Sequence, residues 1–140
     1  MAPSPIAPTG ADRPRVFSGI QPSGALHLGN LLGANLRWVE VQHRADAVFC
    51  VVDLHALTIP KPPGEVGRAT LELATDLLAI GLDPEACVLF VQSTVPQHAE
   101  LAWLMQTVTA FGELSRMTQF KEKRERAERG DGFVSAGLFT

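Results

Sequence analysis

Cysteine is scarce in this sequence, which contains only Cys50 and Cys87 among its 140 residues. Two cysteines cannot form a disulfide framework, and neither has a second candidate ligand at a spacing typical of metal sites. Both occur inside apolar runs, AVFCVV and ACVLFV, where a buried free thiol is the expected state. The sequence therefore excludes a disulfide-stapled scaffold, and we expect no metal site built by the protein itself.

Long apolar runs are also missing. No run approaches the roughly 20 residues that a helix needs to cross a bilayer. The first fourteen residues, MAPSPIAPTGADRP, contain four prolines and lack the apolar centre of a signal peptide. We therefore expect a disordered, proline-rich leader at residues 1–14, a cytoplasmic protein and no membrane partner.

A strong excess of basic residues is missing as well, because 12 Lys and Arg stand against 15 Asp and Glu, a net charge of −3. This balance excludes a strongly basic surface that coats nucleic acid, although it allows a local basic patch. The charge is uneven along the chain. Residues 1–110 contain six basic and ten acidic side chains, whereas residues 111–140 contain six and five. An anionic ligand therefore meets least repulsion in the last quarter.

What the sequence does contain is an alternation of short apolar segments with segments of helical periodicity. The second and third apolar segments have no polar alternation, which is typical of strands covered on both faces. The alternation predicts an α/β fold, a Rossmann-like parallel sheet built from right-handed β-α-β units. Three strands form only the first half of a doubly wound sheet. The expected strands are Arg15–Ile20, Ala47–Val52 and Cys87–Val91.

Four helical segments are expected between and after these strands. A Gly81 stop with Asp83-Pro84 beyond it ends the second helix, and a proline in the first turn opens the third. The fourth is the charged segment KEKRERAER. The apolar stripes of the first three helices are Leu28, Leu32, Leu36 and Val39; Val66, Leu73, Leu77 and Ile80; and Leu101, Leu104, Met105 and Val108.

The turn after the first strand has the composition of a phosphate site. It reads GIQPSGALHLGN, and its glycines allow a close backbone approach and positive φ. A helix that begins near Gly29 offers free amides and a positive dipole end. His27 and Asn30 stand at that entrance, where both could donate hydrogen bonds to one phosphate chain. The string is neither G-x-G-x-x-G nor a P-loop, and a plain strand–turn–helix junction remains the alternative.

The whole string resembles the His-x-Gly-His signature of class I aminoacyl-tRNA synthetases, and it is most similar to the tryptophanyl members. These have a G-x-Q-P-[ST]-G turn ahead of the signature and commonly Asn at its last position. Three further blocks, CVVDLHALTI, LFVQSTVPQHAELAWLM and GELSRMTQFKEK, resemble the same enzymes in the same order. The resemblance covers residues 15–140 and implies a tryptophan–tRNA ligase that forms tryptophanyl-adenylate from ATP and then charges tRNA(Trp).

The resemblance also implies roles for individual residues. His27, Asn30 and Lys123 would stabilise the charge of the reacting phosphates as catalytic residues. ATP would arrive with bound Mg²⁺ as the substrate, and the protein would be a homodimer. The implied ATP-binding residues are Gln21, Pro22, Ser23, Gly29 and Asn30. The implied tryptophan-binding residues are Phe17, Gly19, Gln21, Val52 and His55.

Each of these roles has a simpler alternative. His55 could be a histidine with ordinary partners after a strand, and Phe17 and Val52 could be core residues. Lys123 could belong to a solvated charged helix. Trp103 is most simply a core or dimer-face residue. For Asp53 we expect a loop-capping role, because a carboxylate nucleophile needs no general base.

Part of the enzyme's pattern is missing, since no Lys-Met-Ser-Lys-Ser segment occurs. We therefore expect residues 15–140 to be an incomplete N-terminal part of a nucleotide-binding catalytic domain, inactive in isolation. One alternative is a truncated, non-catalytic paralogue that acts as a binding module. Another is a different nucleotidyl transferase with a His-x-Gly-x motif, such as a tyrosyl-type synthetase or a pantothenate- or nucleotide-synthesis enzyme. The QPSG turn and the MTQFKEK block count against the latter.

Overall fold

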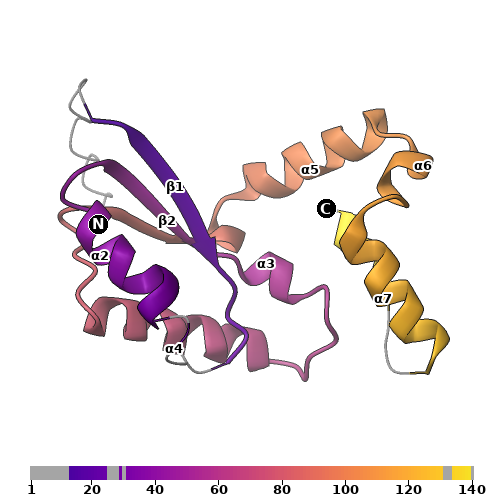
Figure 1. The fold of residues 1–140 in the computed structure, drawn as a ribbon, viewed down its shortest axis with the longest axis horizontal. Helices are drawn as coiled ribbons and strands as arrows, with labels where there is room; N and C mark the ends of the chain where they lie inside the picture. The colour runs from indigo at the N-terminus through magenta and orange to yellow at the C-terminus, as the bar shows by residue number, and fades with distance from the viewer. Residues whose placement is uncertain (1–12, 25–28, 30, 131–133, 140) are drawn as a thin grey trace.

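The structure is a computed structural model that describes residues 13–24, 29, 31–130 and 134–139 (Figure 1). Most of the expected leader, together with His27 and Asn30, lies outside these described residues. The described strands are β1 (Arg15–Ile20), β2 (Asp46–Val51) and β3 (Val88–Val91). The described helices are η1 (Leu31–Asn35), α2 (Leu36–Val41), α3 (Asp53–Ala56), α4 (Glu65–Ala79), η2 (Gln92–Thr94), α5 (Pro96–Val108), α6 (Phe111–Leu114), α7 (Thr118–Glu128) and η3 (Ala136–Phe139).

The three strands form one parallel sheet in the order β1-β2-β3. Ile20 is in register with Val51, and Val51 is in register with Val91. All three strands therefore end at the same edge of the sheet. The predicted α/β fold with a parallel sheet is confirmed, and the described strands are those of the expected first half.

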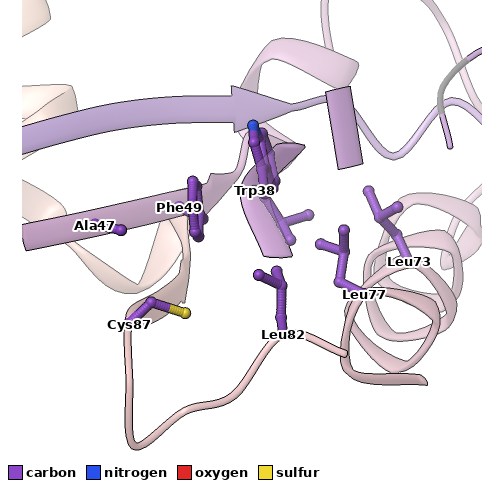
Figure 2. Close-up of a cluster of buried hydrophobic side chains, with 8 residues drawn as sticks. Trp38, Ala47, Phe49, Leu73, Leu77, Leu82 and Cys87 are labelled. Carbon is purple, nitrogen blue, oxygen red and sulfur yellow. The ribbon is translucent and has the colours of Figure 1, made fainter. Parts of the chain in front are cut away.

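One face of the sheet is covered by α2 and α4, which lie side by side beneath it (Figure 1). Trp38 of α2 stacks on Phe49 of β2 with ring centroids 4.5 Å apart and an interplanar angle of 10°. Leu73 and Leu77 of α4 complete the cluster from the other side (Figure 2). Each such side chain removed from water contributes about 1.5–3 kcal/mol. This face therefore holds the core that fixes the sheet.

The first helix buries a different residue from the expected stripe. Trp38 is 6% exposed, whereas Leu36 is 42% exposed. The chain enters α2 through the π-helix η1, whose turn contains more residues than an α-helical turn. This wider turn shifts the phase of the helix, so the aromatic side chain faces the core and Leu36 does not.

The opposite face of the sheet is more open. Phe17 on this face of β1 is 64% exposed. From the β3 side, α5, α6 and α7 extend as an arm, and α7 comes back toward the loop that follows α3 (Figure 1). The expected apolar stripe of α5, from Leu101 to Val108, is exposed. Across the described part of the chain, no helix is long and apolar enough to span a membrane.

Candidate functional site

A polar residue follows each strand at the common carboxyl edge. Gln21 comes directly after β1, Gln92 follows β3, and Asp53 lies two residues after the end of β2. The Asp53 carboxylate accepts a hydrogen bond of 3.0 Å from the backbone N–H of Ser93. The loop-capping role predicted for Asp53 is therefore confirmed. This bond ties the loops after β2 and β3 together at the edge where ligands bind in open α/β sheets.

Three of the expected tryptophan-binding residues share the open face of the sheet near this edge. A Cβ atom at Gly19 would lie 3.0 Å from Val52 Cγ1, so a larger residue at position 19 would require the Val52 side chain to move. The Val52 N–H donates to the Ile20 carbonyl at 2.9 Å. Phe17 lies two residues before Gly19 on the same face and is exposed. Phe17 is therefore not a core residue and remains accessible to a ligand.

The turn after β1 is partly described. The Ser23 N–H donates to the Gln21 carbonyl at 2.9 Å, Pro22 is buried and Ser23 is exposed. Gly24 has a φ of +134°, a value that side-chain-bearing residues rarely adopt. Gly29 is exposed. The turn is thus held in part by its own backbone and exposes Ser23 to solvent.

A cavity of about 390 Å³ opens next to the strand ends. His55 of α3 lines it together with Gln92 and one face of α5, which presents His98, Trp103 and Gln106. Within the described ranges, two buried polar atoms on this wall have no hydrogen-bond partner, Gln92 Oε1 and His98 Nδ1. Unpaired buried polar atoms are costly, so these two atoms mark a polar part of the cavity wall that no described protein group satisfies. Trp103 is 66% exposed and lines the cavity, so it does not belong to the core.

The cavity wall of α5 was not among the expected site residues. A signal for it exists, because Gln92 follows a strand directly and His98, Ala102 and Gln106 recur at every fourth position. That spacing places them on one helical face, and the small Ala102 leaves space. His55 is the expected site residue that this cavity includes, whereas Phe17, Gly19 and Val52 lie on the sheet face.

Lys123 is half-buried on α7, and its Nζ lies 3.4 Å from the hydroxyl oxygen of Thr58. Thr58 is only 5% exposed and follows α3. None of the ion pairs found in the described part of the chain involves Lys123. The ammonium group therefore lies beside the loop after α3, and no described ion pair neutralises its charge.

Cys50 lies on the same sheet face as Gly19, with which it is in register. Burial, together with the nearby Asp53 carboxylate, raises the pKa of the Cys50 thiol to about 11. A thiol with such a pKa stays protonated near neutral pH and is no nucleophile. Over the same described residues, no group of three or more His, Cys, Asp or Glu side chains could hold a metal ion.

An α/β fold with a polar carboxyl edge and an adjacent cavity is the arrangement in which open α/β proteins bind small ligands at the strand ends. Residues 9–140 match the family of class I tRNA synthetases (W and Y). Because this match covers nearly the whole sequence, the chain belongs to that family.

Similar proteins point to one branch of the family. The tryptophan–tRNA ligase of Caldanaerobacter subterraneus subsp. tengcongensis is 60% identical over 126 residues, which is 90% of this chain and 37% of that protein. The crystal structure of tryptophanyl-tRNA synthetase from Campylobacter jejuni matches with a TM-score of 0.80 and 32% identity, over 91% of this chain and 39% of the other. A second structure of the Campylobacter jejuni enzyme, complexed with ADP and tryptophan, matches with a TM-score of 0.77 and 31% identity, over 89% and 38%. The chain thus spans less than two fifths of the length of these relatives.

Proposed function

We propose that the protein is a tryptophan–tRNA ligase, which joins L-tryptophan to ATP as tryptophanyl-adenylate and then transfers tryptophan to tRNA(Trp). The observation that carries the proposal is the 60% identity to a tryptophan–tRNA ligase over 90% of this chain. The fold supports it, because the matched segment contains the strand ends, the signature turn and the cavity. Residues 15–140 would be the N-terminal part of the catalytic domain, and the protein would act in the cytoplasm, where tRNA is charged.

The ATP side of the site would lie along the turn after β1. Gln21, Pro22 and Ser23 would contact the nucleotide, with Gly29 and Asn30 at the start of the first helix. Helix N-termini favour phosphate because free amides and the helix dipole both attract anions. Mg²⁺ would arrive bound to the ATP phosphates as part of the substrate.

The tryptophan side would use Phe17, Gly19, Gln21, Val52 and His55. Phe17 is exposed and Gly19 has no side chain on this face, so a flat aromatic ring could lie against the sheet here. The unpaired atoms of Gln92 and His98 are additional candidates to recognise the polar groups of the amino acid. A structure of a relative complexed with ADP and tryptophan supports this pairing of ligands.

The reaction would need positioning and charge stabilisation more than acid–base chemistry. The tryptophan carboxylate is already a nucleophile, so it attacks the α-phosphorus directly, the bond to the β-phosphate breaks and pyrophosphate leaves. The Lys123 ammonium, with His27 and Asn30, would stabilise the negative charge that builds up on the phosphates. Asp53 is not required as a base, in agreement with its hydrogen bond to Ser93.

The protein would act as a homodimer that binds tRNA(Trp). The exposed apolar side chains of α5 are the surface that we assign to the contact between the two copies, because contiguous exposed apolar surfaces mark interaction sites. The net charge of −3 means that the chain as a whole does not attract tRNA, although a local basic patch can still contact it.

Pyrophosphate exchange with the protein as its gene encodes it tests the proposal. Tryptophan should stimulate exchange of labelled pyrophosphate into ATP, whereas tyrosine should not, and residues 1–140 alone should form no adenylate. Exchange with tyrosine instead of tryptophan would show a tyrosyl-type enzyme. No exchange with any amino acid would favour the non-catalytic binding module.

A further inference from the structure

A polar contact between two side chains joins the loop after α3 to helix α7. The Thr58 hydroxyl oxygen lies 3.4 Å from Lys123 Nζ, although the residues are 65 positions apart in the sequence. Figure 1 shows the loop after α3 reaching toward α7. The Thr58 side chain is buried, and Lys123 is half-buried, whereas the nearby Lys121 on α7 is exposed. Of these two lysines of α7, Lys123 is therefore the one that contacts Thr58.

The partner of Lys123 is a neutral group. A hydroxyl oxygen can accept a hydrogen bond from the ammonium without cancelling its charge. Other basic side chains in the described part of the chain are neutralised instead, such as Lys61 by Glu65 at 2.8 Å and Arg124 by Glu128 at 3.3 Å. Thr58 thus holds the ammonium in place and leaves its charge available for an anion.

Thr58 is itself fixed to the site edge. Its N–H donates to the His55 carbonyl at 3.1 Å, and His55 lines the cavity. At the other end of α3, Asp53 accepts the hydrogen bond from Ser93 at 3.0 Å. The helix α3 is therefore tied to the loop after β3 at Asp53, and the turn that follows α3 ends at Thr58, whose hydroxyl lies 3.4 Å from the Lys123 ammonium.

From this arrangement we infer that Thr58 is a positioning residue for the reaction, which aims Lys123 at the β- and γ-phosphates of ATP. This inference rests on the proposed function, because it assumes that Lys123 contacts the triphosphate. Thr58 touches no substrate atom in this role. Its contribution is to restrict the Lys123 side chain before ATP binds, so that less conformational entropy is lost on binding.

Binding measurements with ATP and AMP test the inference, since AMP lacks the β- and γ-phosphates. Thr58→Val removes the hydroxyl at nearly constant shape, and Thr58→Ser keeps it. We expect Thr58→Val to weaken ATP binding about three- to tenfold, with AMP binding and tryptophan binding unchanged. Thr58→Ser should bind ATP within about twofold of the unsubstituted protein. Circular dichroism shows whether each variant is folded. If the valine variant unfolds, the serine variant still provides a test, because it keeps the hydroxyl and must therefore keep the preference for ATP over AMP.

A Lys123→Met background separates this inference from the proposed function. Lys123→Met alone should weaken ATP binding, and adding Thr58→Val should weaken it no further. If Lys123→Met leaves ATP binding unchanged, the proposed role of Lys123 is wrong. If Lys123→Met weakens ATP binding but Thr58→Val does not, or if Thr58→Val weakens ATP and AMP equally, the positioning role of Thr58 is overturned while that of Lys123 stands.

Discussion

Gln42 is a polar side chain buried in an apolar environment, 1% exposed, and its amide joins two parts of the chain. Its Nε2 donates to the Gly81 carbonyl at 2.9 Å and to the Val39 carbonyl at 3.0 Å. Its Oε1 accepts from the Asp83 N–H at 2.8 Å. The amide therefore provides hydrogen-bond partners for backbone groups of the turn after α4 and is itself fully paired inside the protein.

Replacing Gln42 with leucine should destabilise the protein strongly. Leucine has a similar size but leaves the Gly81 carbonyl and the Asp83 N–H unpaired, so we expect a loss of about 2–4 kcal/mol in the free energy of unfolding. Urea denaturation followed by circular dichroism measures the loss. The matched control is Thr75→Ala, which removes an exposed hydroxyl bond to the Leu71 carbonyl and should change stability by less than about 0.5 kcal/mol. Equal midpoints for Gln42→Leu and the unsubstituted protein would contradict this role of Gln42.

At the level of the element, the end of α4 has the hydrogen bonds of a Schellman motif. The Gly81 N–H donates to the Leu78 carbonyl at 3.1 Å, and the Leu82 N–H donates to the Leu77 carbonyl at 3.1 Å. Gly81 has a φ of +111°, as the motif requires. Leu82 and Leu77 both belong to the core cluster and lie close together in Figure 2. The helix stop is therefore coupled to core packing.

Two glycine-to-alanine changes test this stop. Gly81→Ala forces a side chain into the left-handed region and should cost about 1–2 kcal/mol of stability. Gly67→Ala, inside α4, meets no atom within 4 Å of its new Cβ and should raise stability by about 0.5–1 kcal/mol, because alanine favours the helix. Thermal unfolding of both variants gives the comparison. If the two changes shift the melting temperature in the same direction, the motif does not limit the helix.

Elements with a long periodic pattern could be predicted from the sequence, whereas short ones could not. The helix α4 follows its expected stripe, and Leu73 and Leu77 are buried. The second strand begins at Asp46, one residue earlier than expected, because Asp46 is in register with Arg15 and accepts a 2.6 Å ion-pair bond from it. The one-turn helices α3 and α6 have too few residues to show any period, so only their tertiary contacts define them.

The candidate site likewise has a part that could be predicted from the sequence and a part that could not. The signature turn is continuous in the sequence, so Gln21 could be proposed from the motif alone. The cavity is not continuous, since it joins His55 to His98 across a β-α-β crossover, and its shape depends on the angle at which α5 leaves the sheet. The contact of Lys123 with Thr58 likewise depends on how α7 folds back, which no local pattern specifies.

On the scale of the whole molecule, the packing is one-sided. The face covered by α2 and α4 holds the buried cluster, whereas the open sheet face exposes Phe17 and the arm exposes apolar residues of α5. On α5, Leu104 and Val108 are 57% and 77% exposed, and they lie one helical turn apart on the same side. Removing such a surface from water is favourable, and under the proposed function a second copy of the chain covers it.

A pair of charge substitutions on α5 tests this assembly. Leu104→Glu with Val108→Glu should weaken self-association at least about tenfold, because burying two carboxylates without partners costs more than the apolar contact they replace. Sedimentation equilibrium should then show a monomer at concentrations where the unsubstituted protein is a dimer. The fold should be unaffected, because both side chains are exposed.

Gln97→Glu adds a single negative charge at an exposed polar position of α5 and should leave the dimer intact. A dimer that persists in the double variant, or that dissociates equally with Gln97→Glu, would place the contact between copies elsewhere, and the exposed side chains of α5 would then have to be covered within a single copy.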